Sequence, residues 1–268
     1  MGETERQQTA KEGSPEKQWK GVYTWGGVAT FIVLALLLLD IAISNILGGD
    51  ISRIPATAAG RLRQLAENGM LGLYNHDFLN LIVQIVLLPA YWALYAALRK
   101  ANRAWAGLAL VFFVIGTTVF VAGNAALPMF DLSGKYAAAV NEADRALISA
   151  AGEALLARGA HGSSGAFLAF FLPTFAGLIM SFAMTAEKTF SRATSRLGIA
   201  GNALLLVYFV MVTFVAGADK FAVALAMPGG LLTMAWMVLF ALRLFRLAGN
   251  DQRPGAAGGG VGKNEMPA

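Results

Sequence analysis

Charged residues are scarce in this sequence, and cysteine is missing altogether. Asp, Glu, Lys and Arg make up 14% of the chain, whereas a soluble domain carries about 25% because its surface faces water. Most of the outer surface of this chain therefore does not face water. The lack of cysteine excludes disulfide bonds, thiolate metal ligands and cysteine nucleophiles.

Apolar sequence is abundant instead, since hydrophobic residues make up 57% of the chain. Six apolar runs are each long enough to cross a bilayer, which takes about 20 residues of α-helix. Backbone amides in hydrocarbon must be satisfied within the protein, and the alternation of a membrane β-barrel is absent, so we predict helices. The runs are 26–47, 78–98, 105–127, 165–185, 197–215 and 221–242.

We therefore predict an all-α, polytopic membrane protein whose six-helix transmembrane domain covers residues 21–248. Residues 1–20 are polar without a hydrophobic period, which is typical of a disordered tail. Residues 249–268 are rich in glycine and are predicted to form a flexible tail. The first apolar run is too long for a signal-peptide core and lacks a cleavage pattern, so we expect it in the mature protein.

Lys and Arg are distributed unevenly between the two ends of the predicted helices. Fourteen lie in the N-terminal tail, in the C-terminal end from Arg243 onward and in the connections after the second and fourth helices. Seven lie in the other three connections, two of which are long. Because basic residues collect in cytoplasmic loops, we expect both termini in the cytoplasm and the long connections 48–77 and 128–164 outside.

Both long outer connections contain helical patterns. The first is short and covers 59–68. In the second, Ser133 can cap a helix whose apolar face carries Tyr136, Val140, Ala143, Leu147, Ala151 and Leu155. We predict an amphipathic extracytoplasmic helix between the third and fourth spans. Docking over the outer mouth of the bundle and lying on the lipid surface are both open to it.

Polar side chains inside the spans gather in the outer half of the predicted bundle. A charge in hydrocarbon costs about 2.5–3.5 kcal/mol on the insertion scale, and Asp40 is the only carboxylate well inside a span. The candidate binding residues are Asp40, Ser44, His76, Asn80, Gln84 and Asn124. The alternative interpretation is that these groups hydrogen-bond between helices, each contributing about 1 kcal/mol. We favour that alternative for the three amides, whereas for Asp40 we favour a polar pocket or a proton-linked site that opens outward.

We expect no cofactor, metal or nucleic acid. The two histidines, His76 and His161, both belong to the outer side, but no third ligand stands at metal-binding spacing. A phosphate-cradling loop needs a preceding strand, and nucleic-acid binding needs a folded basic surface. The expected partners are the lipid bilayer and either a membrane-protein partner or a second copy of the chain.

Two sequence features point to a family. One is the outer-loop run SGKYAAAVNEADRALISAAGEALLA, and the other is the basic turn before RLGIAG, between the fourth and fifth spans. Through them the segment from about Tyr23 to Leu247 resembles a bacterial six-helix membrane family known only as a domain of unknown function. The resemblance implies a bacterial cytoplasmic membrane (inner or plasma membrane) and no established activity.

Two shorter motifs give a second, partial resemblance. HDFLN at 76–80 opens the second span, and GSSG at 162–165 precedes the fourth. Both are similar to motifs of the rhomboid intramembrane serine proteases, which implies Ser164 as a nucleophile with His76 and Asn80 near its oxyanion. The sixth span has AMPGG at 226–230, where that family has a histidine. Methionine cannot accept the serine proton, so the general base is absent.

These observations favour a non-enzymatic integral membrane protein. We expect it to bind a small or lipidic ligand, or a partner helix, through the outer-half polar cluster. The first alternative is a transporter or permease. The second is an inactive relative of the rhomboid proteases.

Overall fold

The computed structural model describes residues 15–46, 54–186 and 188–249, and within these ranges the chain forms helices and no strands. This confirms the predicted all-α class. The helices are α2 (Pro15–Ile46), α3 (Ala58–Glu67), α4 (Gly69–Tyr74), α5 (Phe78–Val86), α6 (Leu88–Leu98), α7 (Arg103–Gly123), α8 (Ala126–Ala138), α9 (Glu142–Gly159), α10 (Phe167–Ala183), the 3₁₀ helix η2 (Met184–Ala186), α11 (Arg192–Phe214) and α12 (Asp219–Gly249).

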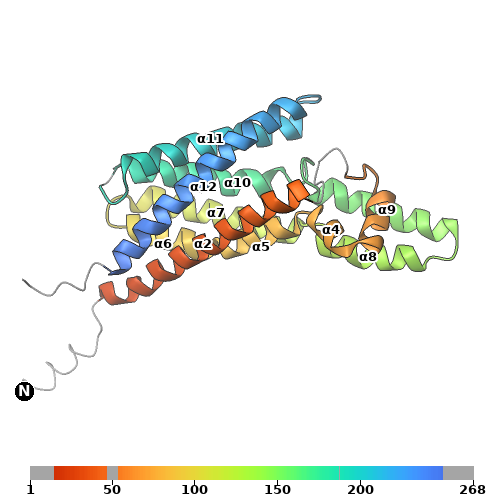
Figure 1. Ribbon diagram of the computed structural model, residues 1–268, viewed down its shortest axis with the longest axis horizontal. Helices are drawn as coiled ribbons and strands as arrows, with labels where there is room; N and C mark the ends of the chain where they lie inside the picture. Colours follow the sequence, from red (N-terminus) through yellow and green to blue (C-terminus); the bar gives the residue numbers. More distant parts are fainter. Residues whose placement is uncertain (1–14, 47–53, 187, 250–268) are drawn as a thin grey trace, which may run out of the picture.

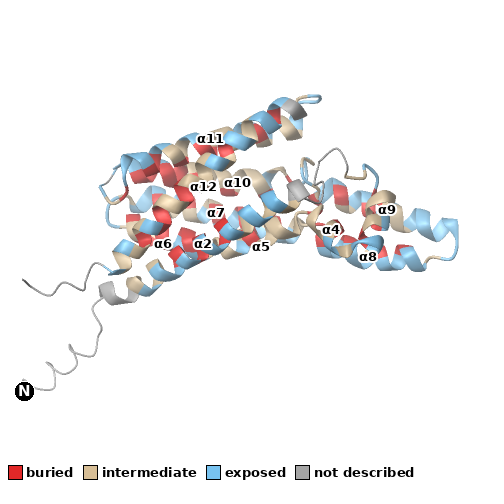
Figure 2. Cartoon of the chain, viewed as in Figure 1, coloured by how far each residue is buried: buried red, intermediate tan, exposed pale blue. Residues whose placement is uncertain are grey.

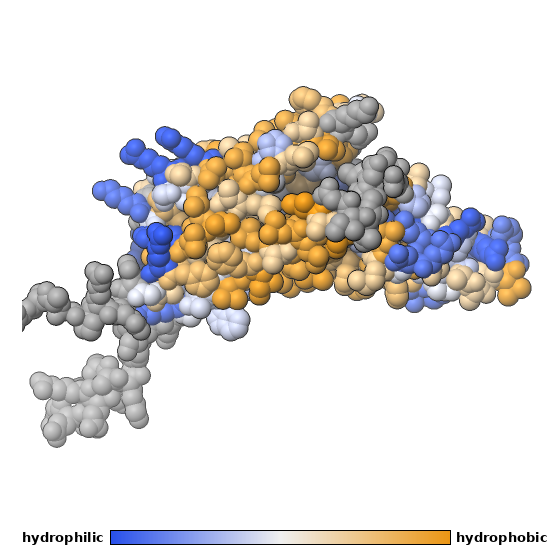
Figure 3. Space-filling view, in the orientation of Figure 1, coloured by the Kyte–Doolittle hydropathy of each residue, from blue (hydrophilic) through white to orange (hydrophobic). Residues whose placement is uncertain are grey.

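Six stretches are long and apolar enough to cross a membrane, so the six predicted spans are confirmed. A broad apolar band covers the middle of the molecule, and hydrophilic residues gather at its two ends (Figure 3). The stretches are Trp19–Ile43, Phe78–Leu98, Arg103–Ala138, Phe167–Ala186, Arg192–Phe214 and Phe221–Gly249.

The first helix begins earlier than the sequence predicts. α2 starts at Pro15, inside the segment 1–20 that is predicted as a disordered tail. Proline is favoured at the first position of a helix, and the Glu, Lys and Gln that follow are good helix formers, so the helix starts ahead of the apolar stretch that begins at Trp19. Residues 1–14 and 250–268 lie outside the described residues.

The six spans pack in a closed ring that follows the order of the chain. α2 packs on α6, α6 on α7, α7 on α10, α10 on α11, α11 on α12, and α12 returns to α2. Figure 2 shows buried positions along the stretches where these helices meet. Within the ring, Tyr91 and Phe113 stack with ring centroids 3.7 Å apart, in a core that also contains Met180, Phe240 and Leu244.

A second, smaller unit extends from one end of this bundle. We call it the cap, and define it as residues 58–74 and 126–159, which form α3, α4, α8 and α9. The cap has its own apolar core, which includes Leu62, Leu65 and Met129. The start of α2 and the end of α12 lie together at the opposite end of the bundle, which we call the tail end (Figure 1).

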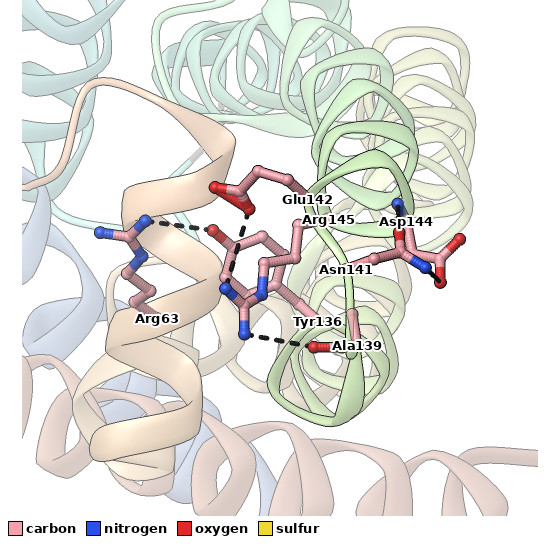
Figure 4. Close-up of polar contacts among 7 residues, drawn as sticks. All are labelled: Arg63, Tyr136, Ala139, Asn141, Glu142, Asp144 and Arg145. Atoms are coloured by element: carbon pink, nitrogen blue, oxygen red, sulfur yellow. Dashed lines mark hydrogen bonds and ion pairs between the residues drawn. The ribbon is translucent and has the colours of Figure 1, made fainter.

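The predicted single helix from 133 to 155 is wrong in detail, because a turn at 139–141 divides it into α8 and α9. Asn141 caps α9 by accepting a hydrogen bond from the Asp144 amide at 2.8 Å, and acidic residues fill the first turn. The cap and the acidic first turn start a new helix at this point, although the apolar residues keep their helical spacing across it. Arg145 donates to the Ala139 carbonyl and Arg63 of α3 donates to Tyr136, which fixes the turn (Figure 4).

Candidate ligand site between the bundle and the cap

Asp77 lies in the short turn that joins α4 of the cap to α5 of the bundle. Its φ of 59° makes it the one non-glycine residue with a left-handed backbone in the described part of the chain. Aspartate adopts this conformation more readily than most residues because its short side chain bonds locally. The amide of Asn80 donates to Asp77 Oδ1 at 2.8 Å, which leaves Oδ2 for a second partner.

That second partner is His161, in the loop between α9 and α10. His161 Nδ1 lies 3.6 Å from Asp77 Oδ2, and His161 Nε2 lies 2.7 Å from the hydroxyl of Tyr208 in α11. The imidazole also packs edge-on against Phe170, with ring centroids 4.7 Å apart. One side chain thus connects the α4–α5 turn, the α9–α10 loop and α11.

The attraction between Asp77 and His161 outweighs the effect that burial has on the pKa values of both groups. Burial raises the pKa of Asp77, but the positive charge of His161 and the hydrogen bond from Asn80 outweigh it and hold this pKa below its ordinary value. Burial lowers the pKa of His161, but the Asp77 carboxylate outweighs it and raises this pKa above its ordinary value. The arrangement therefore favours the state in which both groups are charged.

Asp40, the carboxylate predicted from the first span, belongs to the same cluster. The hydroxyl of Tyr74 in α4 donates to the Asp40 backbone carbonyl at 3.2 Å. The Asp40 carboxylate also lies close enough to interact electrostatically with Asp77 and His161. Ser44 falls in the same helix, but its side chain lies outside what the structure describes.

The other predicted residues divide into two groups. Asn124 lies beside the cluster, since its amide donates to the His76 carbonyl at 3.2 Å. His76 is buried, and its Nδ1 lies 2.7 Å from the Gly72 carbonyl; burial is the main cause that lowers its pKa. Gln84 lies in α5, about two helical turns beyond Asp77. Its buried Oε1 has no hydrogen-bond partner among the described residues.

A cavity of about 250 Å³ lies next to this cluster, between the ends of α7 and α9 and the start of α10. Its walls are mainly apolar, with Val119 and Phe120 from α7 and Ala169 and Phe170 from α10. The polar lining residues are Asn124 and Arg158. Asn124 and Phe170 connect the cavity to the polar cluster, because they contact His76 and His161 respectively.

Arg158 is the cationic group of the cavity. Its guanidinium donates to the Ala122 carbonyl at 3.0 Å, which places it where α9 meets α7. Arg158 itself is exposed, and no carboxylate lies within ion-pair distance of it among the described residues. The close approach of the two helices requires glycine, because a Cβ on Gly159 would lie 2.2 Å from the Gly123 carbonyl oxygen.

The described residues give Ser164 no histidine partner. Both ring nitrogens of His161 face Asp77 and Tyr208, and the Asn80 amide is bonded to Asp77. Nor are three His, Asp or Glu side chains grouped to hold a metal ion in this part of the chain. Among the described residues, the polar cluster offers charge pairing and the cavity offers apolar contact and one guanidinium.

A family model described as a domain of unknown function (DUF4386) matches residues 28–243. The chain belongs to the DUF4386 family. This confirms the family resemblance inferred from the outer loop, while the resemblance to rhomboid proteases stays a prediction. No curated protein and no solved structure matches the chain.

In this DUF4386 protein, sequence reasoning missed the centre of the polar cluster. Asp77 stands between two predicted residues, His76 and Asn80, but it belongs to a turn rather than to a span. For His161 the sequence predicts a position on the outer side but no partner for its side chain. Tyr208 reads as an ordinary aromatic residue of an apolar helix. The one available signal was an Asp-x-x-Asn spacing at the start of the second span, where a side chain can bond across a helical turn.

Proposed function

We propose that this DUF4386 protein is a non-enzymatic membrane protein that binds an amphiphilic ligand with an anionic head group. The observation that supports this most is one cavity of about 250 Å³ that combines an apolar wall with Arg158, which has no carboxylate partner among the described residues. The proposal keeps the lipidic ligand expected from the sequence. It moves the site from the Asp40 cluster to the cavity beside it.

The chemistry of the lining fits the two parts of such a ligand. A guanidinium binds a phosphate or carboxylate through two parallel hydrogen bonds, and a single planar fork such as Arg158 suits one anionic group. The apolar wall suits an acyl chain, but a bilayer lipid only moves its chain from one apolar environment to another, so the contact of the head group with Arg158 decides which lipid binds. The bilayer can supply the ligand, because Val121 and Leu168, beside the cavity, keep 43% and 51% of their surface exposed.

Binding of a phospholipid would test this proposal. The purified protein in detergent is titrated with phosphatidylglycerol and, separately, with zwitterionic phosphatidylcholine, and bound lipid is counted by native mass spectrometry. We expect tighter binding of phosphatidylglycerol to the wild type. Arg158→Gln should weaken it about tenfold, which corresponds to about 1.4 kcal/mol.

Arg145→Gln is the matched control, because Arg145 lies on the same helix and pairs with Glu142 at 3.7 Å. It should leave the preference for phosphatidylglycerol unchanged. Equal affinity of the wild type for both lipids, or equal loss in both arginine variants, would overturn the proposal.

The absence of catalysis is tested separately with a fluorophosphonate probe, which labels activated serine hydroxyls. The proposal predicts no labelling that depends on Ser164. Labelling of the folded wild type that disappears in Ser164→Ala would show an activated serine and refute the non-enzymatic part.

Transport is the second candidate, and the ionisable cluster favours it. Asp40 lies inside a span and interacts with Asp77 and His161 at the mouth of the closed helix ring. In proteoliposomes, a transporter of this ligand would speed the exchange of fluorescent phosphatidylglycerol between leaflets, and Asp40→Asn would abolish the effect. Asp131→Asn is the control, because Asp131 is an exposed cap residue paired with Lys135.

A further inference from the structure

The loop 160–166, which joins α9 to α10, forms part of the rim of the ligand cavity, and we call it the rim loop. Its last two residues, Gly165 and Ala166, line the cavity, and Gly159 just before it does so too. The rim loop is anchored by one side chain, His161, which the α4–α5 turn and α11 hold from two sides. Beside it, Gly162 adopts a left-handed φ of 77°, so the loop turns sharply at this anchor.

We propose that His161 is a positioning residue that holds the rim loop over the cavity, so that the ion pair with Asp77 controls ligand affinity and makes it decrease as the pH rises. This inference rests on the proposed function and adds its regulation. His161 contacts the wall of the cavity through Phe170 rather than the ligand itself.

The charges around His161 explain why its protonation state matters. The α4–α5 turn presents Asp77 and the buried His76; α2 presents Asp40; α11 presents the Tyr208 hydroxyl; and α10 presents the apolar Phe170. Arg61 of α3 is a further charge close enough to interact with Asp77. A protonated His161 is attracted to Asp77 and, more weakly, to Asp40, whereas a neutral His161 loses both attractions.

The sign of the pH effect follows from this arrangement. Because Asp77 raises the pKa of His161 above its unfolded value, the ion pair stabilises the rim loop fully below that unfolded value. The stabilisation is lost as the pH rises through the raised value in the folded protein. Arg158 and the phosphodiester of phosphatidylglycerol keep their charges over the same range, so neither produces this dependence.

The test measures the dissociation constant of phosphatidylglycerol between pH 5.5 and pH 9. For the wild type we expect affinity to fall by several-fold toward alkaline pH. His161→Gln is neutral throughout and should bind at the alkaline level of the wild type, without the pH dependence. Tyr208→Phe keeps the pair with Asp77 and should retain the dependence, whereas Arg158→Gln should bind weakly at every pH.

A second readout does not need the ligand. Hydrogen–deuterium exchange in residues 160–166 is compared between the wild type and His161→Gln at each pH, so that the intrinsic pH dependence of exchange cancels. We expect the wild type to be protected relative to the variant at acidic pH and equal to it at alkaline pH.

The outcomes separate the two proposals. Wild-type affinity that does not change with pH, while Arg158→Gln still binds weakly, would overturn the role of His161 and leave the ligand site. A lack of phosphatidylglycerol binding would refute the ligand site, but pH-dependent protection of the rim loop would still support the anchoring by His161. Equal protection in both proteins at all pH values would overturn it.

Discussion

At the scale of single residues, the junction between bundle and cap depends on side chains with two partners. Asp77 binds Asn80 and pairs with His161, and His161 in turn binds Tyr208. Each side chain orients the next one, because a polar network in which every group has a partner adopts one fixed arrangement. The hydroxyl of Tyr208 is the last group of this network, and Tyr208 is 8% exposed.

Removing that hydroxyl gives a direct measure of the network. We expect Tyr208→Phe to lower the free energy of unfolding by about 0.5–1.5 kcal/mol, because a partly buried hydrogen bond of 2.7 Å is lost while the ring stays. Tyr91→Phe is the control, since its hydroxyl contacts the Pro173 carbonyl only at 3.5 Å. Thermal unfolding in detergent should show the larger decrease for Tyr208→Phe, and the reverse order would contradict this reading.

At the scale of helices and loops, glycine sets how closely the cap approaches the bundle. The α9 helix ends against α7 at Gly159, whereas Gly134 in α8 has open space around it. These two residues differ in packing but not in chemistry. They therefore separate the effect of close approach from the general effect of removing a glycine from a helix.

We expect Gly159→Ala to destabilise the protein by about 1–3 kcal/mol, because its Cβ would lie 2.2 Å from the Gly123 carbonyl oxygen and force the helices apart. Gly134→Ala should be neutral or stabilising by up to about 1 kcal/mol, since alanine favours a helix more than glycine does. Thermal unfolding and phosphatidylglycerol binding check both variants. Unchanged stability in Gly159→Ala would mean that α9 does not need this close contact.

The same scale shows what the sequence could predict. Hydropathy located the six spans, because a bilayer requires about 20 apolar residues in a row. The helix 58–67 was also predicted closely, as 59–68. The turn at 139–141 was missed because the alanine-rich run keeps its helical period across Asn141. The pairing of Asp77 with His161 joins segments far apart in the chain, and no spacing within one helix signals such a contact.

At the scale of the whole molecule, basic residues and apolar surface together suggest how the protein lies in the membrane. The tail end carries two short connections with basic residues: Arg99 follows α6 and Arg103 begins α7, and Arg192 begins α11. The cap extends from the other end of the apolar band (Figures 1 and 3). Because basic residues collect in cytoplasmic loops, we infer that the tail end is cytoplasmic and that the cap and ligand cavity face outward.

Single cysteines provide the test of this orientation, because the natural chain contains none and needs no background removal. Val140→Cys places a thiol at the tip of the cap, where Val140 is 95% exposed, and Ala101→Cys places one in the exposed connection at the tail end. A membrane-impermeant maleimide added to intact cells should label Val140→Cys but not Ala101→Cys. After permeabilisation both should be labelled, which shows that each thiol is reactive. The opposite pattern in intact cells would show that the inferred orientation is wrong and that the Arg158 cavity lies in the cytoplasmic leaflet.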